Sequence, residues 1–281
     1  MTRVFRGVGV EAVRNYWDSR PCNLRHSPSP VGSRQYFDEV EQRKYFVEPH
    51  IPQFAEFPRW RGKRVLEIGC GIGTDTMNFA RAGAQVTAVD LSSRSLEMAR
   101  QRAEIYELSE RITFVQADAE QLSDSVPPEP YDLVYSFGVI HHTPNPERVM
   151  AQIRGHFVHP GSVLKIMVYH RTSWKVAAIV LREGHGAFWK LEELVARSSE
   201  AQSGCPVTYT YTRRSVADLL AGFSIDDIFV DHIFPYRVQD YVQYRYVREW
   251  YFRWMPASMY RGLERRLGWH MCVTARPSGF E

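Results

Sequence analysis

The chain has 281 residues, of which 44% are hydrophobic and 24% are charged, a composition typical of a folded globular protein with one sizeable core. Its formal net charge of +3 is too small to indicate nucleic-acid or membrane-surface binding by itself. The four cysteines lie far apart without a CxxC pair, so they predict neither a disulfide framework nor a zinc site, and we expect no metal. We find no signal sequence and no apolar run of about 18 residues, which predicts a cytoplasmic protein without a membrane span.

The first 58 residues are predicted to form an arm and a helical cap. Residues 1–34 are rich in Arg, Pro and Ser, which indicates an irregular arm. Residues 34–56 carry apolar and aromatic side chains at helical spacing, interrupted by Pro49 and Pro52, and predict one or two helices. Such an aromatic stripe serves ordinary packing more often than it covers a ligand, and both interpretations stay open.

A strand, a tight turn and a helix start are predicted in the segment VLEIGCGIGTDT, residues 65–76. The first residues are mostly apolar, Gly69, Gly71 and Gly73 alternate, and a helix is expected from Thr74. Glycines at this spacing let the backbone turn sharply and approach a ligand, while the helix start offers unpaired N–H groups to its polar parts. The segment therefore predicts a nucleotide-like cofactor site. The alternative is that the glycines serve only strand-to-helix packing.

A second strand, 85–89, ends in Asp90, about twenty residues beyond the glycine turn. A carboxylate at that place can accept hydrogen bonds from the diol of a ribose. The structural alternative is that Asp90 caps the following helix, 91–108. Because Ser92 and Ser93 are better placed to form that cap, we favour ribose binding.

Further strands alternate with helical patterns along the rest of the chain. Strands are expected at 112–117, before Asp118, at 131–136 and at 162–169, and later at 224–233 and 269–276. This alternation predicts a doubly wound α/β fold with ligands at the carboxyl ends of the strands. The domain is expected to span 59–281, with insertions at about 171–208 and 237–268.

The order and spacing of four motifs resemble those of the class I S-adenosylmethionine-dependent methyltransferases, which have a Rossmann-like fold. The resemblance covers residues 62–169, and more loosely extends to 276. Its motifs are EIGCGIGT, Asp90, Asp118 with Ala119, and YDLVYSFGVIHHTPNP. The GxGxG turn differs from the GxGxxG of dehydrogenases. The family's fold is a mostly parallel seven-stranded sheet with a final antiparallel strand, which here corresponds to 269–276 beside 224–233.

The resemblance implies that S-adenosylmethionine is the cofactor. The backbone at Gly69 to Gly71 would hold its methionine part, Asp90 its ribose and Asp118 its adenine, with Phe137 beside the sulfonium. The cap raises Trp17 and Tyr45 as further pocket candidates. In full, the implied cofactor-binding residues are Glu67, Gly69, Cys70, Gly71, Thr74, Asp75, Asp90, Leu91, Asp118, Ala119, Phe137, Gly138 and, from the cap, Tyr36.

Methyl transfer is displacement at a methyl group that already carries a good leaving group, so the protein mainly aligns and desolvates the reactants. A general base is needed only where the acceptor is protonated. His141 and His142, which follow the fourth strand, are candidate catalytic residues, with holding of the loop as an equal alternative. Tyr169 is a third candidate. Candidate substrate-binding residues are Tyr16, Arg171 and Trp174, and lid packing is the alternative for Trp174.

The insertion 237–268 holds seven Arg and three acidic residues, a formal charge of +4 (7 minus 3). Tyr241, Tyr244, Val247, Tyr251 and Met255 fall near helical spacing, which favours an accessory helix. The alternatives are a pocket for an acidic or sugar-bearing substrate, and contact with nucleic acid or a membrane surface.

The sequence thus predicts a methyltransferase that acts on a small-molecule acceptor, with O- or N-methylation favoured, in specialised-metabolite or glycan-related biosynthesis. The alternatives are methylation of RNA or another macromolecule, an NAD-type oxidoreductase, and a non-catalytic cofactor-binding protein. Nucleic acid is a disfavoured partner, and a homodimer is left open.

Overall fold

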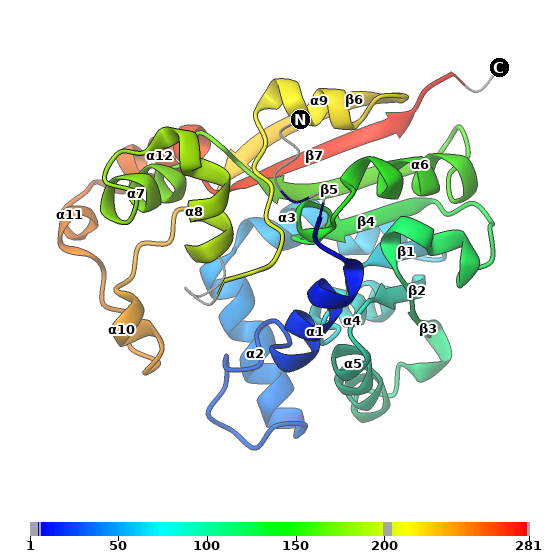
Figure 1. The fold of residues 1–281 in the computed structure, drawn as a ribbon. Coiled ribbons are helices and arrows are strands. Elements are labelled where there is room, and N and C mark those ends of the chain that lie inside the picture. The colour runs from blue at the N-terminus through cyan, green and yellow to red at the C-terminus, as the bar shows by residue number, and fades with distance from the viewer. Residues whose placement is uncertain (1–4, 6, 199–203, 280–281) are drawn as a thin grey trace.

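In the computed structural model, which describes residues 5, 7–198 and 204–279, one seven-stranded sheet runs through the molecule (Figure 1). The strand order is β3-β2-β1-β4-β5-β7-β6. Neighbours from β3 to β5 are parallel, and β7 is antiparallel to both β5 and β6. This confirms the predicted fold class. The strands are β1 (Arg64–Ile68), β2 (Gln85–Asp90), β3 (Ile112–Gln116), β4 (Leu133–Phe137), β5 (Val163–Tyr169), β6 (Phe223–Asp231) and β7 (His270–Pro277).

Helices cover both faces of the sheet because its central strands are apolar on both sides. In β1, Val65 packs in one core cluster, whereas Leu66 and Ile68 pack in the other. The face of the sheet that holds Val65 is covered by α4 (Thr74–Arg81) and α5 (Ser93–Ile105). The opposite face is covered by η3 (Ala119–Asp124), α6 (Pro146–His156) and α9 (Arg213–Leu219). Two further short turns of 3-10 helix are η2 (Ser109–Arg111) and η4 (Ile140–His142).

The amino-terminal cap contains more helix than we predict from the sequence. The expected helices at 34–56 are confirmed as α2 (Arg34–Val47) and α3 (His50–Ala55), followed by η1 (Phe57–Trp60). The prediction of an irregular arm is wrong for α1 (Val10–Ser19). Its apolar positions recur at helical spacing and pack against the main core, which stabilises a helix that the Pro-rich flanks obscure in the sequence; these positions are Val13 and Trp17.

Buried polar contacts hold the cap to the glycine turn. The Lys44 ammonium on α2 lies 2.7 Å from a carboxylate oxygen of Asp75 on α4, and the two side chains are 12% and 3% exposed. The hydroxyls of Tyr45 and Tyr135 donate to the same carboxylate at 2.9 and 3.0 Å. Burial, the largest single effect, disfavours the charged ammonium, but Asp75, Glu48 and Glu67 together outweigh it, and the pKa of Lys44 is raised. This network joins α2, α4 and β4 into one unit.

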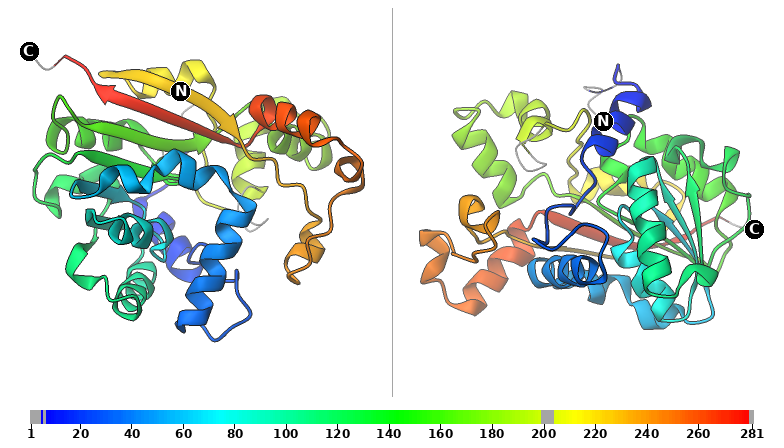
Figure 2. Two further views of the ribbon diagram at one scale, coloured as in Figure 1. Left: turned by 180° about the vertical axis from the view of Figure 1, so that it is seen from behind. Right: turned by 90° about the horizontal axis from the view of Figure 1, so that it is seen from below.

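Two helical insertions follow strands β5 and β6. The first contains α7 (Trp174–Arg182), η5 (Phe188–Lys190) and α8 (Leu191–Ser198). These three elements lie in the insertion expected at about 171–208, of which residues 199–203 lie outside the described part of the chain. The second insertion contains α10 (Val238–Tyr241), α11 (Trp250–Arg253) and α12 (Ala257–Leu267), and Figure 2 shows it on the same side of the molecule as α2. No helix in the described part of the chain is long and apolar enough to cross a membrane.

The prediction of one accessory helix through 241–255 is wrong. Helix α10 ends at Tyr241, because Tyr244 has a left-handed backbone (φ 59°). Arg248 then forms an isolated bridge with Tyr236 instead of continuing a helix. The aromatic residues instead surround Arg43 of α2, whose guanidinium carbon lies 3.9 Å from the ring centre of Tyr241 and 4.5 Å from that of Tyr244. These cation–π contacts fasten the second insertion to the cap.

We predict that Lys44→Met lowers the free energy of unfolding by about 3 kcal/mol, because it leaves the Asp75 carboxylate buried without its cation. The control is Lys63→Met, which breaks a pair with Asp132 whose members are 54% and 26% exposed and should cost less than about 1 kcal/mol. Urea denaturation of the two variants measures both values. Equal losses in the two variants would show that the cap does not depend on the buried pair.

Candidate active site

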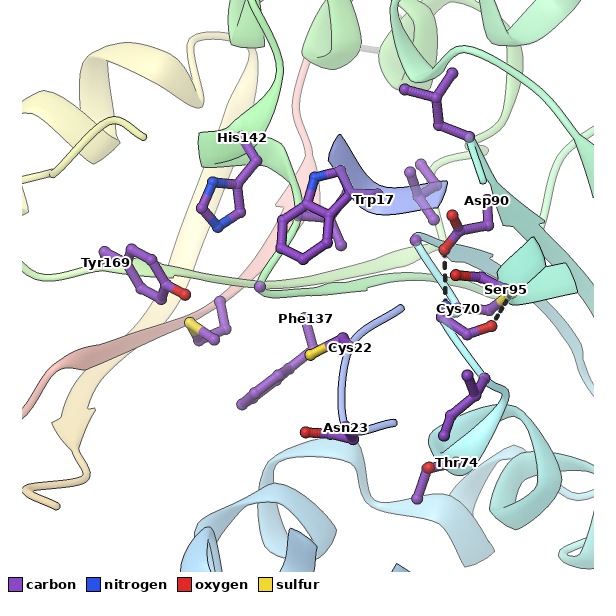
Figure 3. Close-up of a pocket in the computed structure, with 18 of the residues that line it drawn as sticks. Trp17, Cys22, Asn23, Cys70, Thr74, Asp90, Ser95, Phe137, His142 and Tyr169 are labelled. Atoms are coloured by element: carbon purple, nitrogen blue, oxygen red, sulfur yellow. Dashed lines mark hydrogen bonds between the residues drawn. The ribbon is translucent and has the colours of Figure 1, made fainter. Parts of the chain in front are cut away.

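A cavity of about 360 Å³ lies at the carboxyl ends of the central strands, beneath the amino-terminal cap (Figure 3). Asp90 and Cys70 face it from one side, and Tyr169 and His142 from the other, while Trp17 comes from α1 and Cys22 from the following loop. The cavity therefore joins two regions. The first is lined by Ile68, Gly69, Cys70, Gly71, Thr74, Val89, Asp90, Leu91, Asp118 and Ala119, and the second by Glu48, His142, Tyr169, Lys175, His232, Phe234, Tyr241, Trp269 and His270.

The glycine turn forms one wall because the chain must reverse there in a left-handed conformation. Gly69, Gly71 and Gly73 have φ values of 81°, 54° and 77°. A Cβ on Gly69 would lie 2.1 Å from a side-chain atom of Val139, whereas a Cβ on Gly71 would meet no atom within 4 Å. Gly69 is thus required by packing and conformation, and Gly71 by conformation. Gly73 has no side-chain cap to offer the first turn of α4.

Asp90 links the end of β2 to the glycine turn. Its two carboxylate oxygens accept hydrogen bonds from the backbone N–H groups of Gly71 at 2.8 Å and Ser92 at 2.9 Å. The Ser92 hydroxyl, as predicted, caps α5 by accepting from Ser95 N–H. Burial raises the pKa of Asp90 to about 6, against the lowering effect of the two N–H groups, and Asp18 of α1 adds to the rise. The carboxyl therefore changes charge near neutral pH.

The next strand end supplies Asp118 and Ala119, which line the same region. The Asp118 carboxylate accepts from the N–H of Glu120 at 2.9 Å and so begins η3. Phe137 and Gly138, at the end of β4, lie between the two regions of the cavity, and Figure 3 shows the Phe137 ring near its middle. A ligand that spans the cavity would pass over this ring.

His142 and Tyr169 face the second region, and His141 lies behind them. The ring centres of His141 and Tyr169 are 3.8 Å apart, and Tyr169 stacks on Trp269 at 4.0 Å. His142 lies edge-on to Trp17 at 5.3 Å, and its Nδ1 lies 2.8 Å from the carbonyl oxygen of Val207. Burial lowers the pKa of His141 well below its usual value, so its imidazole is neutral at pH 7.

Three further imidazoles converge at the far end of the cavity. His50 Nε2 lies 3.0 Å from His270 Nδ1, and the rings of His270 and His232 stack at 4.5 Å. His270 Nε2 lies 3.6 Å from a carboxylate oxygen of Glu48. Burial lowers the pKa of His232 to about 3 and that of His50 to about 4, so both rings are neutral at pH 7.

Comparison with known proteins identifies the sheet and its glycine turn. Residues 65–161 match a family described as a methyltransferase domain. This span holds the whole first region of the cavity from Gly69 to Ala119. The chain contains a class I S-adenosylmethionine-dependent methyltransferase domain. The resemblance predicted from the sequence is confirmed.

Individual relatives share this domain over part of their length or share the fold. The ubiquinone biosynthesis O-methyltransferase of Vibrio cholerae is 38% identical over 100 residues, which are 36% of this chain and only 39% of the relative. The magnesium protoporphyrin IX methyltransferase of Synechocystis PCC 6803, solved with bound S-adenosylhomocysteine, superposes with a TM-score of 0.58 at 18% identity, covering 95% of this chain and 99% of that one. The [4+2]-cyclase SpnF superposes with a TM-score of 0.54 at 18% identity, covering 98% and 97%. The two structural likenesses show a shared fold.

Most residues predicted to hold the cofactor line the cavity of the methyltransferase domain, and two acidic residues do not. Gly69, Cys70, Gly71, Thr74, Asp90, Leu91, Asp118, Ala119, Phe137 and Gly138 line it. Glu67 is buried under α4, where its carboxylate accepts from the Thr76 hydroxyl at 2.5 Å, and burial together with Asp75 raises its pKa to about 8. The Asp75 carboxylate is paired with the Lys44 ammonium at 2.7 Å.

The predicted cap residue Tyr36 also lies outside the described lining of the cavity. It is fully buried, and its hydroxyl donates to the carbonyl oxygen of Leu24 at 2.9 Å. Tyr45 donates to Asp75, and Tyr16 packs edge-on against Trp17, which itself lines the cavity. These three tyrosines therefore support the cap by contacts outside the described lining of the cavity.

Of the predicted acceptor residues, His142 and Tyr169 line the cavity, whereas the described lining does not include His141. Arg171 lies away from it and pairs with the buried Glu192 at 2.6 Å. Trp174 is 38% exposed and packs on the aromatic rings of α11, which fits the lid-packing alternative.

Sequence reasoning missed the residues that long-range contacts bring to the cavity. Lys44 and Glu48 belong to a helix predicted as a cap, and Cys22 and Asn23 to an arm predicted as irregular. His232 directly follows β6, and His270 is the first residue of β7. The sequence signal that could have found them is a polar residue at the end of a strand.

We predict that Gly69→Ala lowers the free energy of unfolding by about 2–5 kcal/mol, because the left-handed backbone and the clash with Val139 both oppose a side chain. Gly62→Ala is the control, since Gly62 also has a positive φ (69°) but a Cβ there meets nothing within 4 Å. It should cost only about 1–2 kcal/mol. A loss at Gly69 no larger than the loss at Gly62 in urea unfolding would exclude the packing constraint.

Proposed function

We propose that this protein transfers a methyl group from S-adenosylmethionine to a small-molecule acceptor, with an oxygen or nitrogen atom as the favoured target. The observation that carries the proposal is the continuity of the cavity. The glycine turn, Asp90 and Asp118 line one region, Phe137 lies in the middle, and aromatic and polar residues line the second region.

The residues of the first region suit the cofactor. The Asp90 carboxylate is fixed by two backbone N–H groups and keeps further acceptor capacity for the hydroxyls of a ribose. Asp118 and Ala119 offer an acceptor and a backbone donor for an adenine, and the open space beside Gly71 admits the methionine part. When bound, S-adenosylmethionine supplies an electrophilic methyl group on a positively charged sulfur.

The second region suits a small acceptor better than a macromolecule. Trp17 of α1 and Cys22 of the arm lie over the cavity, and Tyr241 of the second insertion lines its far side. An RNA acceptor would require these elements to move away. The enclosure also supports exclusion of water from the acceptor, which is the main task of the protein in a direct displacement. A specialised metabolite or a glycan building block fits these requirements.

Where the acceptor carries a proton, His142 and Tyr169 are the predicted groups nearest to receive or hold it, because both line the second region. His141 would act through them as a positioning residue, since its ring packs on both at 4.2 and 3.8 Å.

The proposal is tested by calorimetric titration with S-adenosylhomocysteine and with NAD, followed by incubation with S-adenosylmethionine and fractionated metabolites. We expect binding of the first compound only, and a product heavier by one methyl group in mass spectrometry. Binding of NAD without S-adenosylhomocysteine would overturn the proposal in favour of an oxidoreductase. Cofactor binding without consumption in any fraction would favour a non-catalytic protein.

We predict that affinity for S-adenosylhomocysteine increases as the pH rises through about 6. The ionised Asp90 carboxylate is the stronger acceptor for a ribose diol, so protonation below its pKa should weaken binding by up to about tenfold per pH unit. Asp90→Asn should weaken binding at pH 7.5 by about 1.5–3 kcal/mol and remove the dependence. Calorimetry at pH 5, 6 and 7.5 measures both effects, and a variant that keeps the dependence would contradict the assignment.

A further inference from the structure

Two histidines and a glutamate meet in the second region of the cavity with the spacing of metal ligands. One ligand atom each from Glu48, His232 and His270 lies within 4.8 Å of the other two, and all three residues line the cavity. His270 Nε2 is 3.6 Å from Glu48 Oε1, close to the separation of about 3.4 Å between two ligands at 2.1 Å from a tetrahedral ion. We propose that Glu48, His232 and His270 bind one divalent transition-metal ion in the acceptor region of the cavity.

The contacts behind these residues are those that orient metal ligands. His270 Nδ1 lies 3.0 Å from His50 Nε2, and His50 Nδ1 lies 3.9 Å from a carboxylate oxygen of Asp231. This chain of contacts leaves His270 Nε2 directed toward Glu48. The His232 ring bonds to the backbone carbonyl of Val47, which leaves its other nitrogen for the ion. A ligand imidazole in proteins ordinarily has its second nitrogen bonded in this way.

Charges of both signs surround the cluster. Glu48 and Asp231 bring two carboxylates, the Lys44 ammonium is paired with the Asp75 carboxylate at 2.7 Å, and the Arg261 guanidinium lies 4.0 Å from Asp231. Lys175 also lines the cavity, so the two carboxylates are the groups that would offset the charge of a bound ion. The rings of His232 and His270 are stacked, the His50 ring is tilted against both, and His50 Nδ1 has no hydrogen-bond partner in the described part of the chain.

The donor set indicates the class of ion. Two imidazole nitrogens and one carboxylate suit Zn²⁺, Co²⁺ or Fe²⁺, whereas Mg²⁺ and Ca²⁺ prefer sites composed of oxygen ligands. Three protein ligands leave at least one coordination position open. Because all three ligands line the cavity, such a position would face it, and the His270 ring lies 5.5 Å from that of Phe137, between the two regions.

The open coordination position on the ion indicates a class of acceptor for methyl transfer. This part of the inference rests on the proposed function. An acceptor with a hydroxyl or carboxylate group would bind the ion through oxygen and be held beside Phe137. A bound hydroxyl loses its proton to solvent more readily, because the ion stabilises the oxyanion. The protein then needs no side chain as general base. O-methylation of a hydroxylated or acidic small molecule is the reaction that this arrangement favours.

The metal site is tested on the full chain without S-adenosylmethionine. The protein is stripped with a chelator and titrated with Co²⁺, whose visible absorption reports coordination by nitrogen, and then with Zn²⁺ in competition. We expect one equivalent of Co²⁺ to give a visible band that Zn²⁺ removes. His232→Ala should weaken binding by more than about 100-fold, and His50→Ala, which removes the residue behind His270, by about 10–100-fold.

Two controls keep the result interpretable. His156→Ala, an exposed change on α6, should leave the titration unchanged, and Glu48→Gln, which keeps the size of a half-exposed ligand, should weaken binding without loss of the folded state in thermal unfolding. Absence of a stoichiometric band in the wild-type protein would overturn the proposal, and so would Co²⁺ binding by His232→Ala and Glu48→Gln that is as tight as that of the wild type. Because the titration needs no cofactor, a protein that binds S-adenosylhomocysteine but no metal refutes this site alone. One that binds metal but not S-adenosylhomocysteine refutes only the proposed methyl transfer.

Discussion

The buried ion pair between Lys44 and Asp75 is the contact on which the cavity depends. The sheet and the glycine turn would form a shallow, open edge by themselves, as strand ends do in doubly wound folds. The pair holds α2 against the first turn of α4, and Tyr45 and Tyr135 complete the hydrogen bonds of the carboxylate. A buried carboxylate is stable only when its partners are all in place, so the network fixes one position of the cap. With the cap in that position, the strand ends are enclosed.

Two aspartates near the turn have different roles because their neighbours differ. Asp75 faces an ammonium and two tyrosine hydroxyls and is committed to holding the structure together. Asp90 receives only backbone N–H groups and lines the cavity, so part of its acceptor capacity is available to a ligand. Burial without a paired cation also raises its pKa to about 6. The local sequence does not distinguish these roles, since Lys44 is 31 residues away from its partner.

The reversed strand β7 explains how the second region acquires its polar residues. Because β7 is antiparallel to β5 and β6, its first residue, His270, pairs with Tyr169 at the end of β5 and with Asp231 at the end of β6. His232 follows directly. Residues from three strand ends thus meet opposite Glu48 and His50 of the cap. The same antiparallel pairing that completes the sheet also completes the end of the cavity.

The sequence by itself determined the α/β class, the five parallel strands and the residues of the first region, because these depend on local patterns: apolar strands, glycines with positive φ, and a carboxylate at a strand end. It did not determine where residues far apart in the chain would meet. Tyr36 and Asp75, predicted to bind the cofactor, do not line the described cavity and contact Leu24 and Lys44. The helix expected through Tyr244 is broken where the aromatic residues gather around Arg43. Only the tertiary structure decided the cap, the second region and the cluster of Glu48, His232 and His270, since each is made of contacts between distant segments.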